Sequence, residues 1–153
     1  MTTTAELAPA DPASGRGRSP REIVTAELWE KQVGLLQRDY PYDSVMAGRV
    51  LGQAYAYLLT AMAHRGEQLG LAPSSLVDIG VHTIILDTAA YAELCDRYNS
   101  GRFLHHVPLV EAKDDGSVMR TARVLAEDGW EVDLPLWADA AKCSPCHPGS
   151  DSH

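Results

Sequence analysis

The sequence is poor in basic residues, has no long apolar run and contains little cysteine. Its 13 Lys and Arg residues stand against 21 Asp and Glu residues, which gives a formal net charge of −8. Nucleic-acid binding depends on clustered positive charge, so this balance argues against a nucleic-acid partner. No run of consecutive apolar residues is long enough to span a membrane. Phosphate-binding loops, serine nucleophile elbows and dinucleotide-binding fingerprints are also missing.

The first 20 residues are rich in Pro, Ala, Thr and Gly, and we expect them to form a disordered tail. No apolar run follows Arg16 and Arg18, so this segment does not have the pattern of a secretory signal, and we expect a cytoplasmic protein. A chain of 153 residues has the size of one domain. We therefore predict one helical domain over residues 21–142, followed by a Cys/His-rich tail over residues 143–153.

The chain lacks the alternation of apolar and polar residues that is typical of strands, so the predicted fold is all-α, with about four main helices. Thr25 is a good N-cap, and the helix that follows it should end at Pro41. Apolar residues at helical spacing predict the longest helix over residues 43–64. Gly48 and Gly52 lie inside that helix and suggest close helix packing there.

The second half of the chain contains further helical patterns. Ser75 and Asp78 have the spacing of a capping box, which predicts a third helix that begins near Ser75. Residues 88–98 carry apolar side chains at helical spacing and should continue that helix or restart it. Ser117 is the expected cap of a helix that ends at Gly129, and a brief helix over residues 136–142 should lead into the tail.

The tail carries the most informative motif, Cys143-Ser-Pro-Cys146-His147. A C-x-x-C-H motif is the attachment signature of c-type haem, but that attachment normally takes place outside the cytoplasm. Two thiolates on a tight turn and a histidine can also bind zinc or another soft metal, with further ligands from elsewhere in the chain. The third interpretation is a polar tail that happens to contain cysteines. We favour metal binding by Cys143, Cys146 and His147.

His82 is the only histidine within the apolar segment 76–86, and it follows Asp78 by four residues, so both side chains lie on one helical face. Such a histidine is more often a core residue than a ligand. If His82 does bind a metal, Asp78 has the usual place of a carboxylate that holds the second imidazole nitrogen. Asp78 is also a candidate helix-capping residue.

His105 and His106 are neighbours whose side chains point in different directions, so only one of them is expected to join a given site. His64 lies near the end of its helix, where an imidazole is a favourable partner of the helix dipole. Cys95 shares an apolar stripe with Tyr91, and we expect it to be buried rather than a ligand.

The segments 75–95 and 101–108 resemble the core of the bacterial glycine-rich domain-containing protein family. That family is expected to show a Trp-His pair, a Leu-x-Thr-x-x-Tyr stretch, a Cys, and Gly-Arg-Phe-x-His-His-x-Pro. This sequence has Val81 in place of the Trp, and Ser100 before Gly101 departs from the usual spacing. The resemblance covers residues 25–108, and the C-x-x-C-H tail is also similar. The resemblance implies no particular mechanism. The residues that match are His82, Tyr91, Cys95, His105 and His106.

These observations predict a small helical metalloprotein whose metal ligands are drawn from His82, His105, His106, Cys143, Cys146 and His147. The expected cofactor is a transition metal ion, zinc in the first place and iron as the alternative. If the site is an enzyme's, with a small molecule as substrate, Asp78 and Tyr91 are the candidate acid–base residues, with Asp87 as a further one. The alternative function is a metal-stabilised interaction module, for which the acidic stretch from Glu111 to Asp133 would be the surface.

Overall fold

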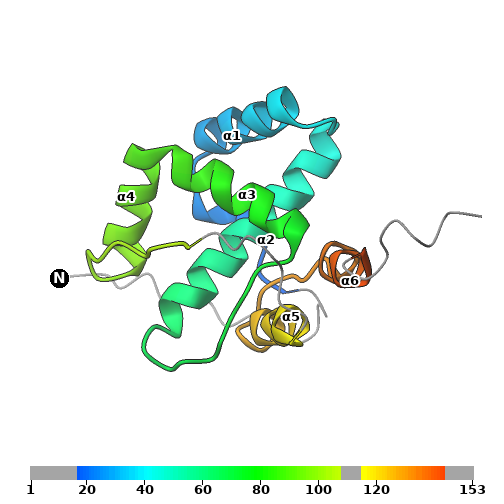
Figure 1. The fold of residues 1–153 in the computed structure, drawn as a ribbon. Coiled ribbons are helices and arrows are strands. Elements are labelled where there is room, and N and C mark those ends of the chain that lie inside the picture. The colour runs from blue at the N-terminus through cyan, green and yellow to red at the C-terminus, as the bar shows by residue number, and fades with distance from the viewer. Residues whose placement is uncertain (1–16, 108–114, 144–153) are drawn as a thin grey trace, which may run out of the picture.

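The computed structural model describes residues 17–107 and 115–143, and within these ranges the protein is all-α, as predicted. A short 3-10 helix precedes six α-helices (Figure 1): η1 (Pro20–Ile23), α1 (Ala26–Asp39), α2 (Ser44–Ala63), α3 (Ser75–Leu86), α4 (Thr88–Tyr98), α5 (Ser117–Glu127) and α6 (Leu134–Cys143). Arg18 and Trp130 form an isolated β-bridge, and the described residues form no strand. None of these helices is both long and apolar enough to cross a membrane.

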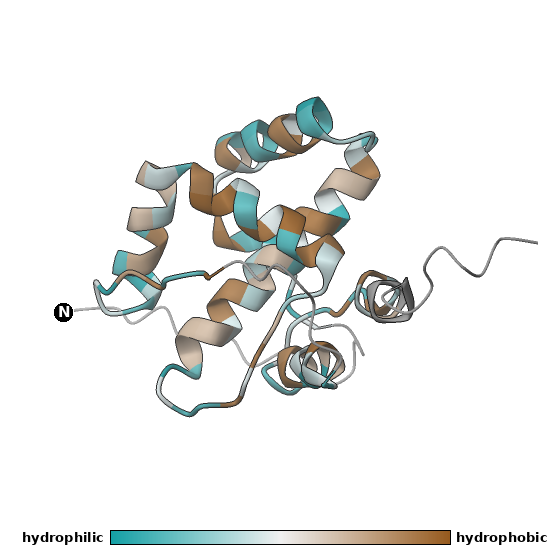
Figure 2. Cartoon of the chain, viewed as in Figure 1, coloured by the Kyte–Doolittle hydropathy of each residue, from teal (hydrophilic) through white to brown (hydrophobic). Residues whose placement is uncertain are grey.

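Helix α2 is the central element of the fold. It packs against η1, α1, α3, α4 and α5, and every residue from Val50 to Thr60 is buried. Figure 2 shows apolar and polar residues following one another along α1 and α3, as expected for helices that bury one face. The largest fully buried side chains include Trp137, Tyr55 and Tyr91. The core therefore surrounds α2, and the other helices pack around it.

Side-chain caps begin three of the helices. Thr25 Oγ1 accepts a hydrogen bond from the Leu28 amide at 3.2 Å, as the sequence predicts. The predicted capping box of Ser75 and Asp78 is wrong by one residue, because it is Ser74 Oγ that accepts from the Val77 amide, at 3.1 Å. The Asp78 carboxylate is thereby free of any capping role.

The prediction for the start of α5 is also wrong by one residue. Gly116, with φ of 79°, is the N-cap, and Ser117 is the first helical residue. The Asp115 carboxylate accepts a hydrogen bond from the Ser117 amide at 3.0 Å. Only glycine adopts a left-handed backbone without a steric cost. Gly116 can therefore take the N-cap position, which a serine would occupy only with strain.

The closest helix packing lies at Gly80 of α3 rather than at Gly48 and Gly52. A Cβ atom added to Gly48 or Gly52 would meet the Trp29 ring at ordinary contact distances of 3.7 and 3.6 Å, and at Gly52 also the Pro20 ring at 4.0 Å. A Cβ on Gly80 would lie 2.7 Å from Ala54 Cβ and 2.9 Å from the Val50 carbonyl oxygen, so a methyl group does not fit. The α3 backbone therefore lies directly on α2, which fixes the helix that carries Asp78 and His82.

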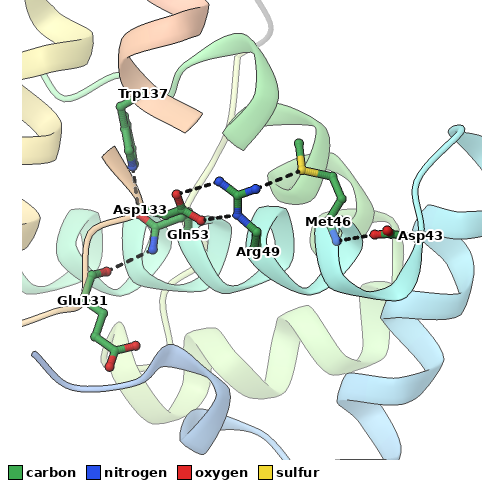
Figure 3. Close-up of polar contacts among 7 residues, drawn as sticks. All are labelled: Asp43, Met46, Arg49, Gln53, Glu131, Asp133 and Trp137. Carbon is green, nitrogen blue, oxygen red and sulfur yellow. Dashed lines mark hydrogen bonds and ion pairs between the residues drawn. The ribbon is translucent and has the colours of Figure 1, made fainter. Parts of the chain in front are cut away.

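Polar contacts hold residues 131–137 on α2 (Figure 3). The Gln53 amide donates to the Glu131 carbonyl at 2.9 Å and accepts from Trp137 Nε1 at 2.8 Å. Beside it, Arg49 makes two hydrogen bonds to the Asp133 carboxylate, at 2.7 and 3.0 Å. The buried Gln53 thus links α2 to α6, whose last residue is Cys143.

Candidate metal centre

Asp78, His82 and His106 form a compact group between α3 and the segment that follows α4. Each offers one ligand atom, and the three atoms lie within 4.8 Å of one another. His106 Nε2 is 3.1 Å from Asp78 Oδ1, and His82 Nδ1 is 3.7 Å from Asp78 Oδ2. The two imidazole rings meet edge to face, with centroids 4.9 Å apart. This His/Asp group could hold a metal ion.

Two atoms of the group are buried without a partner. Asp78 Oδ1 and His106 Nε2 make no hydrogen bond within the described residues, although only 3.1 Å separates them. Buried polar atoms are nearly always satisfied, by protein, water or an ion, and these two atoms lie at ion-pair distance from each other. Two ligands at about 2.0–2.1 Å from a tetrahedral zinc ion lie about 3.3 Å apart. The spacing of these two atoms therefore fits two ligands of one ion.

Local sequence explains how α3 contributes two of the three side chains. Asp78 and His82 are four residues apart, which places them on one helical face. Ser74 caps the helix, so the Asp78 carboxylate keeps its oxygens for the group. Both side chains are partly exposed, at 29% for Asp78 and 43% for His82, so the group lies at the surface edge of the core.

The third side chain reaches α3 because the chain turns sharply after α4 (Figure 1). Ser100 and Gly101 both have a left-handed backbone, with φ of 54° and 76°. Asn99 stabilises the turn: its side-chain amide donates to the Arg102 carbonyl, and its backbone and side-chain oxygens accept from Arg65, which follows α2. The chain then runs back along α3 and brings His106 to Asp78.

Tyr91 supports the same segment from α4. Its side chain is fully buried, and its hydroxyl donates a hydrogen bond to the Leu104 carbonyl. Burial, together with the neighbouring Cys95, raises the pKa of the Tyr91 phenol far above its ordinary value. Tyr91 offers no atom to the His/Asp group. It holds the backbone two residues before His106.

A cleft of about 650 Å³ opens beside the group. Asp78 and His106 both face it, and Tyr57 of α2 and Asp115 lie on its walls. The loop before α3 and the start of α5 complete the lining, which consists of Tyr57, Gly70, Leu71, Ala72, Pro73, Ser74, Ser75, Asp78, His105, His106, Val107, Asp115, Ser117 and Val118.

The structure brings together some of the predicted site residues and not others. His82 and His106 join Asp78, which itself offers a ligand atom. His105 is exposed beside Phe103, with ring centroids 5.2 Å apart, and lies outside the group. Cys143 ends α6, but its side chain lies outside the described part of the structure. Cys146 and His147 are also outside the described residues.

Sequence reasoning missed Tyr57 as a feature of this site. Tyr57 lies within the longest predicted helix and is only 8% exposed. Nothing in the local sequence indicates that its exposed edge meets a cleft formed by residues from three other segments. Cys95 is buried, as predicted.

Comparison of this chain with family models, curated proteins and solved structures finds no match. The resemblance to the glycine-rich domain-containing proteins therefore stays a prediction that depends on the residues quoted above. The geometry of the His/Asp group is what bears on function.

Proposed function

We propose that this protein is a helical metalloprotein whose centre binds a transition metal ion through Asp78, His82 and His106. The observation that carries the proposal is the buried pair of Asp78 Oδ1 and His106 Nε2, which lie 3.1 Å apart and lack hydrogen-bond partners among the described residues. A bound cation would satisfy both atoms at once. A carboxylate and two imidazoles are ligands that zinc and iron both accept.

Zinc is the metal that this ligand set favours. Divalent zinc binds nitrogen and oxygen sites more tightly than divalent iron does, and His/carboxylate sets are common in catalytic zinc sites. Iron is the alternative, because two histidines and one carboxylate also form the ligand set of non-haem iron centres. Metal analysis of the purified protein distinguishes the two.

Three protein ligands leave room for water or a small molecule on the metal. A closed structural zinc site has four protein ligands, whereas catalytic sites keep one position open. The cleft that Asp78 and His106 face supports the open arrangement. Zinc would supply Lewis acidity and a bound water that ionises near neutral pH. We therefore propose a metal-dependent enzyme that acts on a small molecule.

The second candidate is a closed metal site in an interaction module. The observation that favours it is the packing of α6 against α3, because Cys143 ends α6 and the rest of the Cys143–His147 motif follows it directly. In that arrangement Cys143, Cys146 or His147 would complete the ligand set. Thiolate ligation separates this candidate from the open site.

The test uses adjacent histidines as a matched pair. We expect close to one equivalent of metal per wild-type chain, purified without a histidine tag from metal-replete medium. His106→Ala should lose most of this metal, whereas His105→Ala, its exposed neighbour, should retain it. Metal content far below one equivalent in the wild type, or equal loss in both variants, would overturn the proposal.

Cobalt substitution tests the second candidate. We expect the visible spectrum of the cobalt protein to change in His82→Ala and to stay unchanged in the double variant Cys143→Ser, Cys146→Ser. Sulfur-to-cobalt charge-transfer bands that vanish in the double variant would instead establish the closed site. A haem Soret band in the purified protein would favour the c-type haem interpretation of the tail.

A further inference from the structure

We propose that Tyr57 binds ligand in the cleft beside the metal centre, where its hydroxyl donates a hydrogen bond to a small carboxylate or carbonyl compound held by the metal. This inference rests on the proposed function. It names the chemical class of ligand and one residue that recognises it.

The first support is the location of Tyr57. Its ring is packed in the core of α2, with 8% of the residue exposed, and it lines the same cleft as Asp78 and His106. Within the described residues, the Tyr57 hydroxyl makes no hydrogen bond. Tyr57 is therefore a residue of the cleft wall that carries a hydrogen-bond donor and lies beside Asp78 and His106 in the lining.

The second support is the protonation state of the phenol. Burial raises the pKa of Tyr57 to about 12. The hydroxyl therefore keeps its proton at neutral pH and can donate it in a hydrogen bond. A rigid donor of this kind costs little entropy to order, because the ring is already held by the helix packing.

The charge of the cleft selects the ligand class. Among the described residues, the lining contains two carboxylates, Asp78 and Asp115, and no Lys or Arg. Arg120 is close to this wall, but its guanidinium donates to the Leu69 carbonyl. Phosphate esters normally require several cationic or amide donors, so this lining disfavours them. A divalent ion on two neutral histidines and one carboxylate keeps one positive charge, which suits one carboxylate or polarises one carbonyl.

The size of the cleft agrees with a small molecule. Ligand sites generally occupy about 300–1,000 Å³, and this cleft measures about 650 Å³. One oxygen of the ligand would bind the metal, and another would accept from Tyr57. Such a two-point contact fixes the orientation of the ligand relative to the metal.

The experiment titrates the cobalt-loaded full-length protein with acetohydroxamate, a small chelating oxygen donor, and follows the visible spectrum. We expect Tyr57→Phe to bind acetohydroxamate about 10-fold more weakly than the wild type, which is typical for the loss of one hydrogen bond to a charged oxygen. Cobalt affinity and thermal stability should stay at wild-type values, because phenylalanine preserves the ring packing. Tyr98→Phe, which alters a tyrosine outside the cleft, should bind the probe like the wild type.

The outcomes separate this inference from the proposed function. If the wild type binds no cobalt, the metalloprotein proposal itself fails. If cobalt binds but acetohydroxamate leaves the spectrum unchanged, or if Tyr57→Phe binds the probe as tightly as the wild type, only the role of Tyr57 is refuted. A comparison of inorganic phosphate with acetate tests the class of ligand. Tighter binding of phosphate than of acetate would overturn the carboxylate assignment.

Discussion

The Tyr91 hydroxyl donates a hydrogen bond to the Leu104 carbonyl, and this bond joins α4 to the segment that carries His106. The Tyr91 ring also meets the Phe103 ring edge to face, with centroids 4.9 Å apart. Both contacts act on the backbone just before His106. This geometry makes Tyr91 a support of the backbone that carries His106.

The variant Tyr91→Phe tests this role. It keeps the ring and removes the hydrogen bond, so we expect a loss of roughly 1 kcal/mol in the free energy of unfolding of the metal-free protein. Cobalt affinity should also fall, because His106 is then held less firmly. Urea denaturation and cobalt titration measure the two effects. Tyr98→Phe is the control; an unchanged cobalt affinity in Tyr91→Phe would show that the segment positions His106 without this bond.

A pair of glycines tests the close packing of α3 on α2. Gly80→Ala places a methyl group 2.7 Å from Ala54 Cβ and 2.9 Å from a backbone oxygen, so we expect a destabilisation of about 1–3 kcal/mol. Gly34→Ala is the matched control in α1, because no atom lies within 4 Å of its added Cβ. Alanine is the better helix former, so Gly34→Ala should stabilise the protein by about 0.5–1 kcal/mol.

Denaturant unfolding of the two glycine variants measures the expected loss of stability in Gly80→Ala and the expected gain in Gly34→Ala. If Gly80→Ala were as stable as the wild type, the two helices would have to separate at little cost. Metal binding offers a second measurement, since displacement of α3 moves Asp78 and His82 together. We therefore expect Gly80→Ala to weaken cobalt binding and Gly34→Ala to leave it unchanged.

Local signals predicted the helices well. The Thr25 cap gave the start of α1, and the apolar spacing gave α2 almost to the residue. The errors at Ser75 and Ser117 arise because adjacent residues compete for one cap position. Ser74 and Ser75 are chemically identical, and the choice between them depends on how α3 packs. Close packing was expected at the α2 glycines but occurs at Gly80, because helical spacing does not reveal which partner approaches.

The candidate site was predictable only in part. The four-residue spacing of Asp78 and His82 is visible in the sequence, and their common face follows from it. The choice of His106 over His105 depends on the turn at Ser100 and Gly101 and on the Tyr91 hydrogen bond, which are tertiary features. Tyr57 could not be predicted, because its cleft is built by segments far apart in the chain.

His64 should make stability depend on pH. Its Nε2 lies 2.9 Å from the Asp128 carboxylate of the α5 C-cap, and its Nδ1 lies 2.9 Å from Glu67. The hydrogen bond to Asp128 is the main cause that raises the pKa of His64 above its ordinary value, and Glu67 adds to it. Because the folded pKa exceeds the unfolded value of about 6.5, this contribution is complete below that pH and is lost as pH rises through the folded pKa.

The measurement is a difference between two proteins at two pH values. We expect the wild type to exceed His64→Gln in the free energy of unfolding by more at pH 6 than at pH 9. Both values lie well above the usual carboxylate pKa, so Asp128 and Glu67 stay ionised. The subtraction cancels the titration of the other histidines. An equal difference at both values would mean that protonated His64 gains nothing from the two carboxylates.

The contacts in Figure 3 support a last prediction, on two residues of α2 that reach the same segment. Gln53 is 4% exposed and satisfies both Trp137 Nε1 and the Glu131 carbonyl. In Gln53→Met the buried Trp137 Nε1 loses its acceptor, which costs about 1–3 kcal/mol, whereas the carbonyl of the exposed residue Glu131 can bond to water instead. We therefore expect a destabilisation of about 1–3 kcal/mol, together with a change in tryptophan fluorescence as Trp137 loses its partner.

Arg49→Met is the matched control, because it removes the ion pair to Asp133 from the same helix face. The Arg49 side chain is 42% exposed, and exposed ion pairs contribute only about 0–1 kcal/mol. Urea denaturation of the two methionine variants should therefore give a much larger loss for Gln53→Met. Equal losses would mean that the ion pair holds this segment on α2 as strongly as the buried amide does.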